Sequence, residues 1–147
     1  MVGILLITHN GLGESLIDCL HHVTGRIPHN IKSLSVLAKD NPQRKEEEAR
    51  ALVKSLDSGK GVLLLTDIFG ATPSNIARRI CEPGHIEGVA GVNLPMLLRV
   101  ACGPDMPLLT MAQRAAQGGR DCIVSLDRDI EWAKKPLNNP IDCHEKN

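Results

Sequence analysis

Two patterns of hydrophobic residues alternate along most of this chain: short apolar runs, and apolar residues spaced three or four positions apart. Short continuous apolar runs predict buried strands at residues 2–8 and 61–66; a weaker strand is predicted at 31–37, and further strands at 87–92 and near 121–126. Runs without a polar face are typical of a parallel sheet that is covered on both sides. Between these runs, apolar residues recur every three or four positions, as on the buried face of a helix. The first such stripe consists of Leu12, Leu16, Leu20 and Val23.

Proline and glycine mark where the predicted helices begin and end. In Asn41-Pro42 a capping residue precedes a proline at the first helical position, and Thr72-Pro73 repeats this signal. Pairs that contain glycine interrupt the helical pattern. They lie at Pro83-Gly84, at Gly103-Pro104 between helices 95–102 and 107–117, and at Gly118-Gly119 before the last strand.

Strands that alternate with helices predict an α/β fold, doubly wound, with a mainly parallel sheet. The pattern covers residues 1–126, which we interpret as one domain. Over residues 127–147 it dissolves into prolines, asparagines and charges of both signs. We interpret this last segment as a C-terminal tail appended to the domain.

Composition narrows the function classes. Lysine plus arginine and aspartate plus glutamate both number 17, so we expect neither a basic nucleic-acid face nor a polybasic membrane anchor. The aromatic residues Phe69 and Trp132 are too few for a stacking platform. The apolar start lacks the positive residues of a signal peptide, and no run approaches the ~20 residues of a membrane span. Five cysteines without a CxxC pair are expected to be reduced thiols in the cytoplasm.

Two polar residues stand at the carboxyl ends of predicted strands. His9 directly follows the run 2–8, and Asp67 directly follows the run 61–66. Ligands of open α/β sheets bind outside such ends, so adjacent strands would bring both side chains into one crevice. A carboxylate that holds the proton of one imidazole nitrogen leaves a lone pair on the other, which favours a nucleophile or a base. The alternative is that the two residues cap unrelated loops.

The segment Phe69-Gly70-Ala71-Thr72-Pro73 opens a helix with small residues. Gly70 and Ala71 allow backbone N–H groups to approach a ligand, and Thr72 offers a hydroxyl. The helix start adds a partial positive charge. We therefore interpret Gly70, Ala71 and Thr72 as phosphate-binding residues, although Thr72-Pro73 equally serves as an ordinary N-cap.

Other motifs are incomplete. Gly11 and Gly13 begin a GxGxxG pattern, but Leu16 stands in place of its third glycine. Neither a P-loop nor a GxSxG sequence occurs, which disfavours nucleotide-driven transfer and serine hydrolysis. The remaining histidines lack metal-ligand spacing with any cysteine, namely His21, His22, His29, His85 and His144. We expect no cofactor and no metal.

Three segments occur in order along the chain: GILLITHNG from residue 3, GVLLLTDIFGATPSN from residue 61 and AGVNLPML from residue 90. Together they resemble the enzyme IIA component of the mannose/fructose class of the bacterial phosphoenolpyruvate-dependent sugar phosphotransferase system. The resemblance implies strand order 2-1-3-4 and a homodimer in which the last strand is exchanged between subunits. It also implies that His9 is phosphorylated, that Asp67 orients its ring, and that Thr72 supplies the hydroxyl of the phosphate loop. Gly70-Ala71-Thr72-Pro73 departs from the frequent Gly-Gly-Ser-Pro of that family but keeps the hydroxyl.

As such a phosphotransferase, the protein would accept a phosphoryl group on His9 from the histidine-containing phosphocarrier protein. It would pass the group to a separate enzyme IIB component for sugar uptake, and it would meet the membrane indirectly, through the permease complex. Two alternatives stay open: a regulatory module phosphorylated on His9 in a system without a permease, and a small-molecule enzyme that uses His9 as a base. Apolar residues of the third segment belong either to a docking face or to the core, namely Leu94, Met96 and Leu97.

Overall fold

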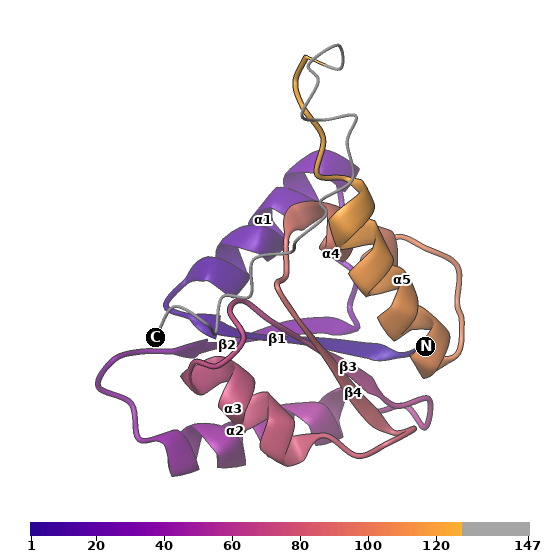
Figure 1. Ribbon diagram of the computed structural model, residues 1–147. Helices are drawn as coiled ribbons and strands as arrows, with labels where there is room; N and C mark the ends of the chain where they lie inside the picture. The colour runs from indigo at the N-terminus through magenta and orange to yellow at the C-terminus, as the bar shows by residue number, and fades with distance from the viewer. Residues whose placement is uncertain (128–147) are drawn as a thin grey trace, which may run out of the picture.

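Within residues 1–127, which the computed structural model describes, helices cover both faces of a four-stranded sheet (Figure 1). The strands are β1 (Gly3–His9), β2 (Ile31–Val36), β3 (Val62–Thr66) and β4 (Ile86–Ala90). The helices are α1 (Leu12–Thr24), α2 (Pro42–Leu56), α3 (Thr72–Ile80), α4 (Leu94–Ala101) and α5 (Leu108–Asp121). The predicted tail 127–147, apart from its first residue, lies outside the described residues.

The sheet has the order β2-β1-β3-β4, and every neighbouring pair is parallel. This confirms the predicted fold and strand order. The register pairs Ile7 of β1 with Thr66 of β3 and His9 with Val36 of β2. Because parallel strands end at the same edge of a sheet, His9 and the residue that follows β3, Asp67, emerge together. The fold therefore supplies the adjacency that the candidate site requires.

Successive residues of β1 enter two separate apolar cores. Ile4 and Leu6 pack with α1, α4 and α5, whereas Leu5 and Ile7 pack with α2 and α3. Figure 1 shows these two groups of helices on opposite faces of the sheet. Side chains alternate between the faces of a strand, so a strand buried on both faces is apolar at every position. Each buried aliphatic side chain contributes about 1.5–3 kcal/mol to stability.

The third resembling segment, residues 90–97, runs from the end of β4 into the first half of α4, and two of its apolar residues lie in the interior. Met96 and Leu97 are 3% and 0% exposed and belong to the core beneath α4 and α5. Their interpretation as a docking face is therefore wrong, because the apolar stripe of α4 is turned onto the sheet. Leu94, at the start of the helix, is half-buried.

The predicted break at Gly118-Gly119 and the strand after it are absent. α5 continues through both glycines to Asp121, and residues 122–127 contain no strand. A Cβ on Gly118 would come within 3.1 Å of Arg99 Cγ on α4. The carbonyl of Gly119 accepts a hydrogen bond from Asn93 Nδ2 at 3.1 Å. The two glycines therefore allow a close approach of α5 to α4 instead of ending the helix.

Two further expectations concern membranes and thiols. Among the described residues, no helix combines the length and the apolar character that a bilayer span requires. The cysteines in this part of the chain are free thiols, as expected: Cys19, Cys81, Cys102 and Cys122. Cys143 lies outside it.

Gly61 lies directly before β3, where two loops at the amino edge of the sheet pack closely. Gly61 has φ +85°, and a Cβ there would lie 2.6 Å from the backbone oxygen of His85. Gly59 has φ +102°, but a Cβ there would meet nothing within 4 Å. Both alanine variants strain the backbone, so their difference isolates the clash. We expect Gly61→Ala to lower the free energy of unfolding by about 1–3 kcal/mol more than Gly59→Ala in urea denaturation; equal losses would contradict the packing role of Gly61.

Candidate active site

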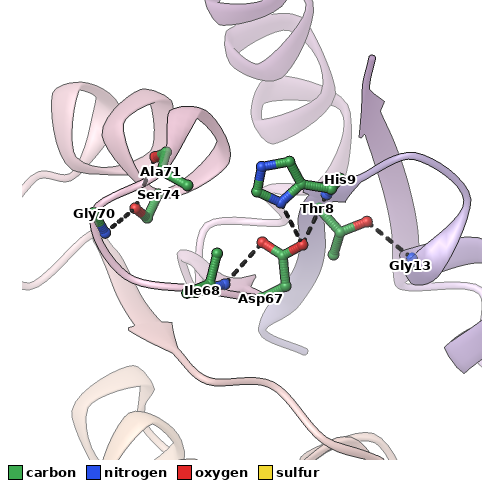
Figure 2. A network of polar contacts seen from close by, with 8 residues as sticks. All are labelled: Thr8, His9, Gly13, Asp67, Ile68, Gly70, Ala71 and Ser74. Carbon is green, nitrogen blue, oxygen red and sulfur yellow. Dashed lines mark hydrogen bonds and ion pairs between the residues drawn. The ribbon is translucent and has the colours of Figure 1, made fainter. Parts of the chain in front are cut away.

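His9 and Asp67 form one hydrogen-bonded pair at the carboxyl edge of the sheet (Figure 2). Asp67 Oδ2 lies 2.8 Å from His9 Nδ1 and also accepts the backbone N–H of His9 at 2.9 Å. Asp67 Oδ1 accepts the N–H of Ile68 at 2.9 Å. Both carboxylate oxygens are held, so the imidazole is fixed relative to the end of β1. The structure thus brings together the two residues that the sequence placed in one crevice.

A short bonded turn positions His9. β1 ends at His9, and Asn10 turns the chain with φ +48°, a conformation that asparagine tolerates better than most residues. The N–H of Asn10 donates to the carbonyl of Val36 on β2 at 3.0 Å. The buried hydroxyl of Thr8 accepts the N–H of Gly13 at 2.9 Å and so ties the start of α1 to β1.

The pair has a buried and an open side. The side chain of Asp67 is 12% exposed, whereas that of His9 is 44% exposed. Burial raises the pKa of Asp67, but the N–H and the ring of His9 and the N–H of Ile68 outweigh it, so this pKa lies below its ordinary 3.8. The ionised carboxylate accepts the proton on His9 Nδ1 and leaves a lone pair on Nε2. Figure 2 shows the second ring nitrogen pointing away from Asp67, toward the side on which α3 begins.

The loop after Asp67 leads directly into α3. Gly70 has φ +91°, and Ala71, rather than the predicted Thr72, occupies the N-cap position. Thr72 is the first residue of α3 and makes no capping hydrogen bond. The predicted cap is displaced because Ser74 bonds back to the loop. Its hydroxyl accepts the N–H of Gly70 and donates to the carbonyl of Ala71, both at 2.9 Å (Figure 2).

These contacts distinguish the three predicted phosphate-binding residues by whether the backbone N–H of each is already hydrogen-bonded. The N–H of Gly70 is engaged by Ser74, which leaves it unavailable to a ligand. The N–H groups of Ala71, the N-cap, and of Thr72, the first residue of α3, have no intrahelical carbonyl partner. They stand at the positive end of the helix, and Gly70 itself follows Asp67 by three residues, a span of at most ~10 Å.

A second His–Asp pair lies at the opposite edge of the sheet and includes His85, one of the histidines without metal-ligand spacing in the sequence. His85 precedes β4 and Asp57 precedes β3, and His85 Nε2 lies 2.9 Å from Asp57 Oδ2. Asp57 Oδ1 accepts the N–H groups of Gly59 and Gly61 at 2.8 and 3.2 Å. The Gly59 bond, aided by Gly61 and His85, holds the pKa of Asp57 below 3.8 against its partial burial. This pair joins two loops that are remote from His9.

The two lowered pKa values predict an acid-sensitive fold. Folding favours the ionised forms of Asp57 and Asp67, so their contribution to stability is complete above the ordinary pKa of 3.8. It is lost as the pH falls through the lower pKa of each folded carboxyl. We expect the urea midpoint to fall from pH 5 to pH 2.5, and Asp57→Asn to flatten part of this fall. A pH-independent midpoint over that range would contradict both assignments.

The surroundings of the pair are open and apolar. Leu12, Ile68 and Phe69 are 44%, 59% and 52% exposed. The guanidinium of Arg78 lies over the ring of Phe69, 5.7 Å from its centroid. Among residues 1–127, no group of three histidine, cysteine or acidic side chains is arranged to hold a metal ion. The imidazole of His9 is thus presented at the surface of the protein.

Sequence comparisons relate the chain to known proteins. A sequence profile of the family described as "PTS system fructose IIA component" (EIIA-man) matches residues 3–113. The chain is 30% identical over 128 residues to the PTS system mannose-specific EIIAB component of Escherichia coli K12, which covers 85% of this chain and 39% of that protein. It is 30% identical over 101 residues to the PTS system fructose-specific EIIA component of Bacillus subtilis, 68% of each chain. The chain thus spans less than half the length of the Escherichia coli relative.

Solved structures share the fold. The mannose/sorbose specific IIA subunit from Enterococcus faecalis has a TM-score of 0.77 at 24% identity, and the likeness covers 86% of this chain and 95% of that one. The phosphotransferase system component EIIA from Streptococcus agalactiae has a TM-score of 0.76 at 18% identity, covering 85% and 97%.

Proposed function

Because this chain belongs to the family of PTS system fructose IIA components, we propose that it is a phosphocarrier with a phosphohistidine intermediate. His9 Nε2 accepts a phosphoryl group from the histidine-containing phosphocarrier protein and passes it to an enzyme IIB component for sugar uptake. One observation carries this proposal: the 2.8 Å contact with Asp67 fixes the ring through Nδ1 and leaves Nε2 of a partly exposed side chain available.

The step is a substitution at phosphorus between two imidazoles. The lone pair of His9 Nε2 forms the new N–P bond while the donor's N–P bond breaks, and the donor nitrogen keeps that bonding pair. His9 Nδ1 retains its proton, so the product is a phosphorylated imidazolium. The carboxylate of Asp67 stabilises its positive charge. Transfer to the IIB acceptor reverses these roles.

The start of α3 supplies donors for the phosphoryl oxygens. The N–H groups of Ala71 and Thr72 and the hydroxyl of Thr72 are the groups we assign to this contact. They lie at the positive end of the helix, where anions are favoured. Gly70 has a different role, because its φ of +91° shapes the loop and its N–H is already bonded.

Mass spectrometry of the wild-type chain tests the proposal. After incubation with phosphoenolpyruvate and the two general phosphotransferase proteins, we expect a mass gain of one phosphoryl group that peptide mapping places on His9. An unmodified chain would overturn the phosphocarrier proposal and favour a base role for His9. A chase with purified IIB components then separates transport from regulation, because a chain that keeps its label with every cognate IIB chain fits the regulatory alternative.

The remaining partner assignments follow from the same proposal. The acceptor is an enzyme IIB component, and contact with the membrane is indirect, through the permease complex. Such a carrier works in the cytoplasm, where its phosphoryl donor is. The open apolar surface around His9, with Ile68 and Phe69 exposed, suits brief docking of successive partners.

We also propose that the chain forms a homodimer through its carboxyl-terminal segment. Within residues 1–127, β4 is an edge strand with one unpaired side. After α5, Ile123, Val124 and Leu126 are 75%, 60% and 106% exposed, and Figure 1 shows this segment extending away from the body. A partner strand would satisfy both features. We expect light scattering to give twice the mass of the chain and Leu126→Asp to weaken the dimer; a monomer at high concentration would contradict the assignment.

A further inference from the structure

Ser74 connects the first turn of α3 with the loop that precedes it. Its side chain is 3% exposed, and its hydroxyl makes two hydrogen bonds of 2.9 Å. One accepts the N–H of Gly70, and the other donates to the carbonyl of Ala71. The single donor of this hydroxyl is used within the protein and the oxygen is buried, so Ser74 is not placed to contact a phosphoryl group.

The two bonds of Ser74 fix the peptide group before Gly70 and the peptide group after Ala71. The first holds the peptide that ends at Gly70 N–H, and the second holds the peptide that begins with the carbonyl of Ala71. The same carbonyl accepts the N–H of Asn75 at 3.0 Å. In a planar trans peptide the C=O and N–H point in opposite directions. Since the carbonyl of Ala71 is held toward α3, the N–H of Thr72 is directed out of the helix start.

We propose that Ser74 is a positioning residue for phosphoryl transfer, which holds the N–H groups of Ala71 and Thr72 in the orientation that receives the phosphoryl oxygens. This role rests on the proposed phosphocarrier function. Donors that are oriented in advance need no reorganisation when charge develops, which is why their alignment changes the rate of the step. A loop freed from the hydroxyl of Ser74 keeps the same donors but loses their alignment.

Ser74→Ala and Ser74→Thr test this role by single-turnover and steady-state transfer from the phosphocarrier protein. We expect Ser74→Ala to lower kcat about tenfold and to leave KM within about twofold, because the docking surface is unchanged. Ser74→Thr keeps the hydroxyl and should restore most of the rate. Thr24→Ala is the matched control, because it removes a hydroxyl that bonds the Leu20 carbonyl at the end of α1 remote from His9.

Amide hydrogen exchange measures how well the loop is ordered, independently of phosphoryl transfer. We expect exchange at Gly70 to accelerate in Ser74→Ala and to stay slow in Ser74→Thr and Thr24→Ala. Unchanged exchange, wild-type kcat in Ser74→Ala, or equal losses in the alanine and threonine variants would overturn the positioning role. A wild-type chain with a protected Gly70 amide that accepts no phosphoryl group would overturn the proposed function itself, and this role with it.

Discussion

Replacing His9 by alanine is expected to abolish labelling of the chain from phosphoenolpyruvate. The substitution removes the nitrogen that, in the proposed mechanism, forms the new bond to phosphorus. The fold should be retained, because the ring of His9 is 44% exposed at the end of β1 and outside both apolar cores. Intact-mass spectrometry before and after incubation with the two general proteins measures the effect.

His85→Ala is the matched control, because His85 is also paired with a carboxylate, at 2.9 Å, but at the opposite edge of the sheet. This variant should accept a phosphoryl group as the wild type does. Label that persists in His9→Ala, or that disappears in His85→Ala, would show that phosphorylation occurs elsewhere. Circular dichroism of both variants separates loss of chemistry from loss of fold.

Asp67→Asn is expected to slow phosphoryl transfer by about two orders of magnitude. The amide carries no negative charge to stabilise the phosphorylated imidazolium. Its NH2 group can also donate to His9 Nδ1, which would move the ring proton to Nε2 and occupy the attacking lone pair. In the opposite orientation, the amide oxygen takes the place of Asp67 Oδ2 and still accepts the backbone N–H of His9, and the loss of negative charge alone slows the step. Rapid-quench single-turnover measurements give the rate.

Asp57→Asn provides the comparison for this second variant. Asp57 is the other carboxylate paired with a histidine, and its pKa is likewise lowered. Its loss should change acid stability and leave the transfer rate unaltered. If Asp67→Asn transferred at the wild-type rate, the orienting and charge-stabilising role of Asp67 would be untenable.

The parts of the fold that local sequence determines were predictable. The runs that form β1 and β3 are apolar up to Thr8 and Thr66 because both faces of each strand are buried. α2 begins as predicted because the side chain of Asn41 accepts the N–H groups of Gln43 and Arg44. Strand order is a long-range property, and its prediction came from the resemblance rather than from periodicity.

The features that the sequence did not predict depend on tertiary contacts rather than on local sequence. Gly118 and Gly119 resemble a helix end in sequence, yet they serve the contact of α5 with Arg99 and Asn93, which lie much earlier in the chain. The pairing of His85 with Asp57 likewise joins residues that no local pattern relates. Ser74 was missed because a hydroxyl in the first turn of a helix gains its role only from the loop onto which it folds back.

The central position of β1 limits how the state of His9 can be communicated. This strand is hydrogen-bonded on both sides, and its residues up to Thr8 are buried between two layers of helices. Local opening of such an element requires nearly the whole free energy of unfolding. A charge added to the imidazole is therefore not transmitted through the protein by a local rearrangement of β1. If His9 carries a phosphoryl group as proposed, a partner protein therefore distinguishes its two states by direct contact with the exposed edge of the site, where the charge changes.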